Sequence, residues 1–268
     1  MQPALRLRPL LAAAIAAAVL VLVVLGACGE DASSEPRAAL PDAAGELAAG
    51  IEEADAAWRQ ALDDWRAAGS PEPLPDEVAV PGGFVQRAAR RLAGHPRIAE
   101  RTLRQIPHGL ARQVRHMIRA NRNLRRLSAG WPAHEIRSGP PTSLEVLMPA
   151  YREAERRFGV HFRILAAVNR IESGFGRARN DSVAGARGPM QFIPSTWKIY
   201  GLGGNIHDPH DAILGAANYL DQSGAPGSYR DALFAYNPSR LYVDAVLRYA
   251  RLIGRDRESF YLLYSWPI

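Results

Sequence analysis

Cysteine and lysine are almost absent from this chain of 268 residues. Cys28 is the one cysteine, which excludes an internal disulfide, a cysteine-cluster metal site and a CxxC redox pair. Lys198 is the one lysine, so the 33 basic residues are nearly all arginine, and they exceed the 27 acidic residues by six. This modest excess does not favour nucleic acid as a partner, and a hydrophobic content of 47% predicts a folded core.

Cys28 follows an N-terminal segment with the layout of a signal peptide. Arg6 and Arg8 precede an uninterrupted apolar run over 10–25, and two small residues lie directly before the cysteine. This arrangement resembles the bacterial lipobox, in which the cysteine is lipidated and becomes the new N-terminus. We therefore predict a signal peptide over 1–27 and a lipid anchor at Cys28, with an uncleaved anchor helix or a plain signal peptide as alternatives. All three place the rest of the chain outside the cytoplasm, in the bacterial envelope.

Two regions are expected between the cysteine and residue 141. Residues 28–83 read as a tether, one amphipathic helix over 45–68, and a linker over 71–83 in which four prolines precede a pair of glycines. Residues 84–141 form an arginine-rich helical region, with twelve arginines and a single acid, Glu100, between 84 and 127. The arginines form either a surface for anionic polymer or lipid headgroups, or a solvated helix face.

Residues 142–254 read as a helical domain, followed by a tail over 255–268. No alternating strand pattern is longer than a few residues, and Asp208-Pro209 supplies a cap and a first-turn proline for one helix. The expected fold class is all-α. His207 and His210, beside Asp208 and Asp211, have the composition of a metal site, but their spacing matches no known cage. No metal or organic cofactor is expected.

Glu172 is the residue in this domain that most needs an explanation. On a helix over 162–173, it falls between Leu165 and Val168 on the apolar side. A glutamate is rarely buried without a partner, and apolar surroundings raise its pKa. Such a carboxyl suits a general acid for glycosidic cleavage, although a glutamate satisfied by a buried arginine or by capping amides is an alternative.

Four ordered motifs carry a resemblance. Residues 172–176 read Glu-Ser-Gly-Phe-Gly, 185–197 read Gly-Ala-Arg-Gly-Pro-Met-Gln-Phe-Ile-Pro-Ser-Thr-Trp, 208–213 begin a helix, and 235–237 read Ala-Tyr-Asn. Their order and spacing resemble the bacterial murein lytic transglycosylases over about 144–253. Some motifs resemble the soluble enzymes and others the membrane-bound B-type. The resemblance implies a lysozyme-like helical catalytic domain of the goose type, here preceded by a helical N-terminal extension.

The resemblance also implies the roles of individual residues. Glu172 would be the single acid/base, and Tyr236 would hold its carboxyl by a hydrogen bond. The implied substrate-binding residues are Ser173, Met190, Gln191 and Asn237. Taken singly, Tyr236 also fits a core position, Asn237 a helix stop, and Gln191 a cap for the helix that opens at 194.

The expected function is cleavage of the peptidoglycan glycan strand between N-acetylmuramic acid and N-acetylglucosamine, with 1,6-anhydro ends, by a monomeric enzyme. Two alternatives stay open. One is a muramidase that uses water for the same bond, and the other is a peptidoglycan-binding lipoprotein without turnover. Asp181 is the nearest downstream acid, but its turn context favours a local side-chain hydrogen bond. A single well-placed carboxylate favours the anhydro route.

Overall fold

The structure is a computed structural model that describes residues 39–129, 137–255 and 258–265. Within these residues it contains eleven α-helices and, in place of any strand, two isolated bridges, which confirms the all-α class. The predicted signal peptide and Cys28 lie outside the described residues. None of the described helices is long and apolar enough to span a bilayer.

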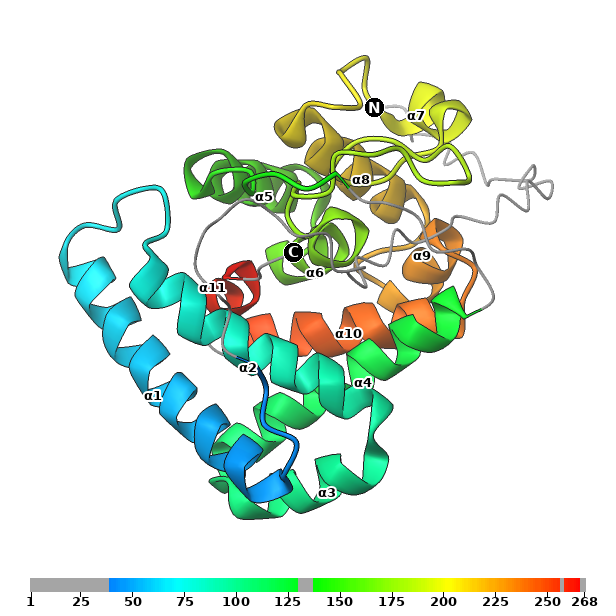
Figure 1. Cartoon of the computed structure of the whole chain (residues 1–268). Helices are drawn as coiled ribbons and strands as arrows, with labels where there is room; N and C mark the ends of the chain where they lie inside the picture. Colours follow the sequence, from blue (N-terminus) through cyan, green and yellow to red (C-terminus); the bar gives the residue numbers. More distant parts are fainter. Residues whose placement is uncertain (1–38, 130–136, 256–257, 266–268) are drawn as a thin grey trace.

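The first four helices form one side of the molecule (Figure 1). A long helix α1 (Ala44–Ala67) runs beside α2 (Asp76–Gly94), and α3 (Pro96–Gln105) and α4 (His108–Ser128) follow. Helix α3 packs mainly on α1, whereas α4 packs on α2 and on α10 (Arg240–Arg255). Helix α10 therefore joins this N-terminal layer to the rest of the chain.

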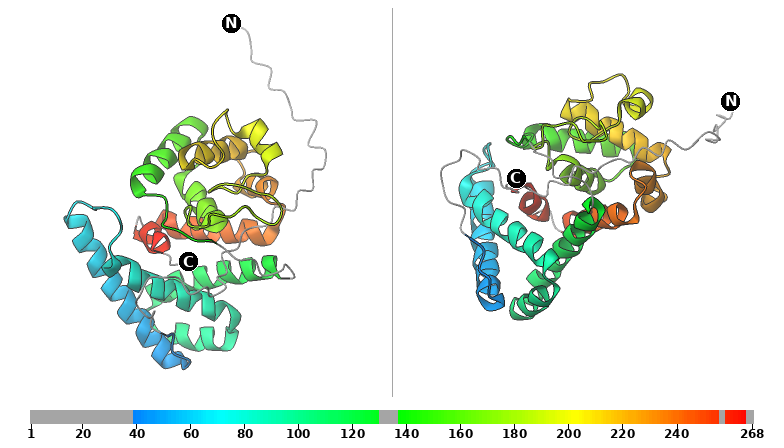
Figure 2. Two further views of the ribbon diagram at one scale, coloured as in Figure 1. Left: turned by 45° about the horizontal axis from the view of Figure 1, so that its top comes forward. Right: turned by 45° about the vertical axis from the view of Figure 1, so that its right-hand side comes forward.

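The remaining helices form the other side (Figures 1 and 2). Helix α6 (Phe162–Ser173) packs on α10, and α5 (Leu144–Phe158) packs on α8 (Pro209–Gln222). Two short helices, α7 (Pro194–Tyr200) and α9 (Tyr229–Tyr236), lie beside α8. Buried side chains from both sides belong to one hydrophobic cluster. The N-terminal extension thus shares its core with the region that holds the candidate site.

The predicted linker over 71–83 is wrong in its second half. Helix α2 already begins at Asp76 and contains Pro81. At Gly82, an added Cβ would lie 2.8 Å from the ring of Trp58 and 2.9 Å from Ser265 Cβ. The glycine therefore permits close packing of α2 against α1 and the C-terminal segment, and tertiary contacts outweigh its low helix propensity.

The predicted C-terminal tail is also partly wrong, because residues 258–264 form α11 (Glu258–Tyr264). Phe260 is buried and makes edge contacts with Phe175 and Tyr151. This helix is only two turns long, so its apolar periodicity is too short to identify from the sequence. It covers the end of α6 that leads to the candidate site.

Candidate active site

Glu172 lies at the end of α6, where the sequence placed it. The helix has the predicted bounds, and Gly174 caps it in the left-handed conformation with φ 61°. Glycine is the residue that adopts this conformation without steric cost. Glu172 is 0% exposed, as its position on the apolar side of the helix predicts. A substrate can reach the carboxyl only when side chains that cover it are displaced.

Tyr242, on α10, is the hydrogen-bond partner of this carboxyl. Its hydroxyl donates to Oε1 of Glu172 over 2.6 Å. Burial raises the pKa of Glu172 to about 8, and the Tyr242 hydrogen bond opposes part of that rise because it favours the charged form. The carboxyl therefore keeps its proton at neutral pH. Its other oxygen, Oε2, is buried without a hydrogen-bond partner among the described residues.

The predicted hydrogen bond from Tyr236 to Glu172 is therefore wrong. Tyr236 is buried at the end of α9 and donates to the carbonyl oxygen of Met190 over 2.6 Å. Its ring stacks on that of Tyr242, with 6.5 Å between centroids and 9° between planes. Tyr242 was missed because it shares an apolar helix face with Val246 and Tyr249, which predicts core packing. The one available signal was that a buried tyrosine hydroxyl needs a partner.

Ser173 and Tyr236 fix the loop that follows α6. Ser173 Oγ donates to the carbonyl oxygen of Pro189 over 2.6 Å and accepts from the backbone N–H of Gly176 over 2.8 Å. Together with the Tyr236 bond to Met190, this holds two successive carbonyls of the loop. At Gly188, with φ 71°, an added Cβ would lie 1.9 Å from the carbonyl oxygen of Ile206. The Gly-Pro-Met sequence thus specifies a tight loop against the neighbouring chain.

The predicted substrate-binding residues are gathered near this loop and are all buried. Met190 is 0% exposed, Gln191 2% and Asn237 3%. Gln191 has φ 49° and donates from Nε2 to the carbonyl oxygen of Gly188, so it does not cap α7. Its Oε1 is buried without a hydrogen-bond partner among the described residues. Asn237 occupies the C-cap of α9, which agrees with the helix-stop interpretation.

Aromatic residues near the site pack against one another. The ring of Trp197 meets that of Phe192 edge-on at 5.1 Å. Added Cβ atoms at Gly201 and Gly215 would lie 2.4 Å and 2.6 Å from the Trp197 ring. Trp197 therefore packs closely against neighbouring side chains and backbone.

The residues with a metal-like composition take part in local structure. Asp208 accepts from the backbone N–H of Asp211 over 3.0 Å, which confirms it as the N-cap of α8. Asp211 accepts from the backbone N–H of Asn205, and His210 Nε2 lies 2.9 Å from a carboxylate oxygen of Glu153. Asp208, His210 and Asp211 lie close enough to share an ion, but these protein contacts already account for their positions.

No second carboxylate among the described residues contributes to the pKa shift of Glu172. Burial and the Tyr242 hydrogen bond are the causes of its pKa shift. Asp181 is about half exposed and pairs with Arg187, 3.3 Å from its Nε. The site can therefore donate one proton from a buried carboxyl and take one back, but it has no evident second base.

Comparison with known families identifies a domain that contains this site. A family model described as the Transglycosylase SLT domain matches residues 149–252, a span that runs from α5 into α10 and includes Glu172, Tyr236 and Tyr242. Searches of curated proteins and of solved structures gave no significant match. Residues 149–252 of this chain therefore form a transglycosylase SLT domain, which is a lytic transglycosylase domain with a lysozyme-like helical fold and peptidoglycan as its substrate.

Proposed function

We propose that this protein cleaves the β-1,4 bond between N-acetylmuramic acid and N-acetylglucosamine and leaves a 1,6-anhydromuramic end. The observation that carries the proposal is the fully buried carboxyl of Glu172, with a pKa raised to about 8 and one oxygen, Oε2, without a partner in the described part of the chain. A protonated acid at neutral pH is what departure of the sugar oxygen requires.

The reaction needs one group that acts twice. Oε2–H of Glu172 protonates the glycosidic oxygen as the bond to C1 of the muramic acid breaks, and the substrate's acetamido group stabilises the positive charge at C1. The Glu172 carboxylate then takes the proton of the C6 hydroxyl, whose oxygen bonds to C1. Glu172 gives up one proton and regains one, so the reaction balances without consuming water. Tyr242 keeps Oε1 in place through its 2.6 Å hydrogen bond.

Hydrolytic glycosidases usually use two carboxyl groups, roughly 5 to 9.5 Å apart. Asp181 is exposed to solvent and paired with Arg187, which argues against a role as the second group. Digestion of purified sacculi, followed by mass spectrometry of the released muropeptides, tests the chemistry. We expect products one water lighter than reducing ends, without oxygen label from labelled water. Labelled reducing ends would instead establish a muramidase, and no release of muropeptides would favour the binding lipoprotein.

We also propose that Cys28 carries the lipid that holds the protein at the extracytoplasmic face of a bacterial membrane. The support is the sequence alone, since Cys28 directly follows an apolar run and two small residues. Fractionation of cells that express Cys28→Ala tests it. We expect the variant to lose the lipid mass and to leave the membrane fraction. A variant that stays membrane-bound at the wild-type mass would contradict lipidation.

A further inference from the structure

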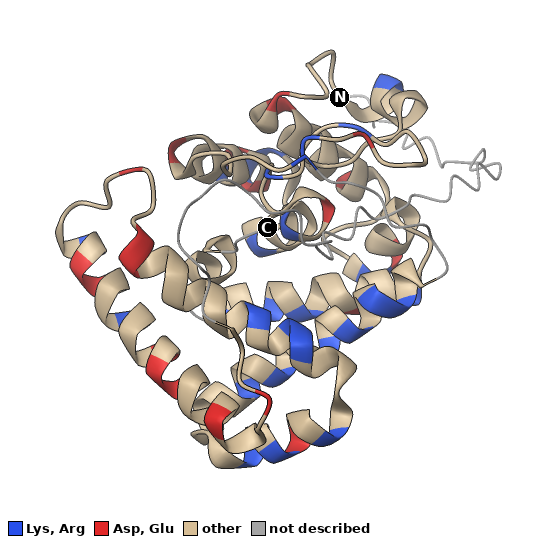
Figure 3. Cartoon of the chain, in the orientation of Figure 1, with Lys and Arg blue, Asp and Glu red and all other residues tan. Residues whose placement is uncertain are grey.

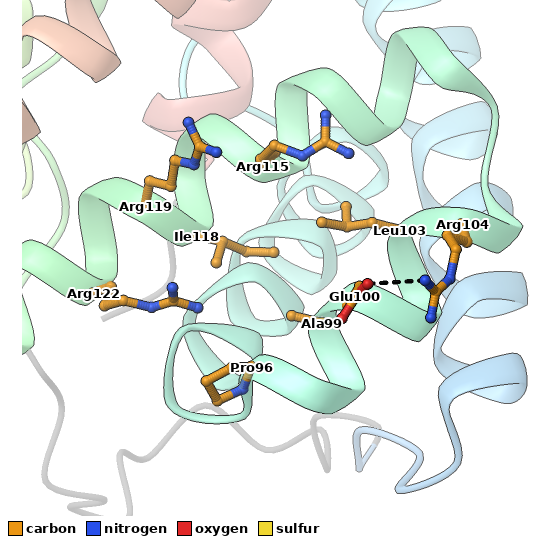
Figure 4. A pocket seen from close by; sticks show the side chains of 9 residues that line it. All are labelled: Pro96, Ala99, Glu100, Leu103, Arg104, Arg115, Ile118, Arg119 and Arg122. Atoms are coloured by element: carbon orange, nitrogen blue, oxygen red, sulfur yellow. Dashed lines mark hydrogen bonds and ion pairs between the residues drawn. The ribbon is translucent and has the colours of Figure 1, made fainter.

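A basic cavity lies between α3 and α4 (Figure 4), two helices on the N-terminal side of the molecule (Figure 1). Its volume is about 400 Å³, which falls within the range of small-ligand sites. Arginines are the main polar residues of its wall, and basic residues are frequent on α3 and α4 as a whole (Figure 3). The lining arginines are Arg104, Arg115, Arg119 and Arg122.

Three of these arginines have no anionic partner among the described residues, and two of the three have no polar partner at all there. Glu100 is the single acid of the lining, and it pairs with Arg104 at 2.8 Å. Arg122 donates from Nε to the carbonyl oxygen of Ala93. Arg115 and Arg119 form neither an ion pair nor a hydrogen bond with the described residues. The cavity therefore holds a surplus of positive charge, with two guanidinium groups available to a ligand.

The rest of the lining is apolar. Ala99 and Ile118 are buried beneath the arginines, and Pro96 and Leu103 complete this part of the wall. A guanidinium group binds phosphate through two parallel hydrogen bonds, while an apolar floor accommodates carbon atoms next to the phosphate. This combination fits a phosphodiester on a glycerol backbone better than a bare inorganic ion.

The start of the described chain lies beside α2 and α3. Arg91 donates to the carbonyl oxygens of Leu40 and Pro41 over 2.8 and 3.0 Å, and Thr102 Oγ1 on α3 donates to that of Ala44. The apolar run ends 15 residues before Leu40, a length that spans at most about 50 Å. A membrane that holds the N-terminal segment would thus be within reach of the α3–α4 side.

We propose that the α3–α4 cavity binds the phosphodiester headgroup of an anionic phospholipid and turns this side of the protein toward the membrane. Arg115 and Arg119 are the principal contacts. The site lies on a different set of helices from Glu172, so it orients the enzyme without contributing to bond cleavage. The proposal does not require that Cys28 be lipidated.

Sedimentation with vesicles tests the proposal on residues 29–268, which keep every described helix and the shared core. Vesicles of phosphatidylcholine are compared with and without phosphatidylglycerol. We expect binding to the anionic vesicles alone, and the double variant Arg115→Gln/Arg119→Gln should bind about thirty-fold more weakly. The control is Arg97→Gln/Arg101→Gln, which removes the same amount of charge. Both arginines are exposed on α3 and do not line the cavity. It should retain most of the binding.

An equal loss in both double variants would overturn the cavity in favour of a diffuse basic surface. A soluble poly(glycerol phosphate) serves as the second arm. Binding to this polymer without binding to vesicles would overturn the lipid assignment, as would binding to vesicles that contain phosphatidylcholine alone. Circular dichroism and the melting temperature of each variant establish that it is folded before its binding is compared.

Discussion

Glu172 and the arginines of the α3–α4 cavity differ in how much water reaches their charges. Glu172 is 0% exposed, and burial raises its pKa to about 8. The side chains of Arg119 and Arg104 are exposed, and those of Arg115 and Arg122 are partly so. A buried carboxyl with a raised pKa holds at neutral pH a proton that it can transfer, whereas guanidinium groups open to solvent act by attracting anions. Burial thus separates a group suited to proton transfer from groups suited to binding.

Removing the acid should have the largest effect on activity. Glu172→Gln keeps the shape of the side chain but removes the transferable proton, so turnover of sacculi should fall by at least about 10² to 10⁴-fold. Arg119→Gln, a change of charge in the cavity, should leave turnover of the same material near the wild-type value. Release of muropeptides, followed by chromatography, measures both. Activity of Glu172→Gln within ten-fold of wild type would assign the acid to another residue.

The same substitution should reveal the cost of burying Glu172. Its pKa is about 8 in the folded protein against an ordinary value of 4.5, so between these values the folded state binds a proton that the unfolded state has released. Stability therefore falls as pH rises from about 4.5 to 8. Glu172→Gln should gain stability over wild type across this window, on the order of a few kcal/mol at its upper end.

Denaturant unfolding at several pH values measures this gain. Glu100→Gln, which removes a carboxyl from the cavity wall, is the control and should show no comparable trend. A constant difference between Glu172→Gln and wild type at every pH would contradict a raised pKa.

The two tyrosines near the acid should differ in their effect on the pH profile. Tyr242→Phe removes the hydrogen bond that lowers the pKa of Glu172, so the alkaline limb of the rate profile should move to higher pH. Tyr236→Phe removes a bond to the Met190 carbonyl and should lower the rate with little movement of that limb. Rate profiles between pH 5 and 10 decide the matter, and an equal shift in both variants would contradict the assignment of Tyr242.

Salt should have the smallest effect on cleavage itself. Peptide-free glycan oligomers should be cleaved by Arg115→Gln/Arg119→Gln at a rate within about two-fold of wild type, at low salt and at 1 M, where the screening length is only ~3 Å. Vesicle binding by the wild-type protein should be lost over the same range. A parallel loss of oligomer cleavage would show that the cavity and the acid act together.

Local sequence was sufficient where neighbours in the chain decide the conformation. The bounds of α6, the left-handed Gly174 cap and the Asp208 cap of α8 all follow from residues within about four positions of each other. The burial of Glu172 followed from its place on the apolar face of α6. The ordered motifs indicated the SLT domain that the family match supports over residues 149–252.

Tertiary packing decided the rest. Whether Tyr236 or Tyr242 reaches Glu172 depends on how α10 lies against α6. Tyr242 is 70 positions after Glu172 in the sequence, so no local signal predicts their contact. Residues 81–83 resemble a linker in sequence, yet they are helical because Gly82 fits against Trp58 and Ser265. The space between α3 and α4 likewise arises because each packs mainly on other helices. Sequence determines which faces are apolar, but contacts between distant segments select the partner that each face receives.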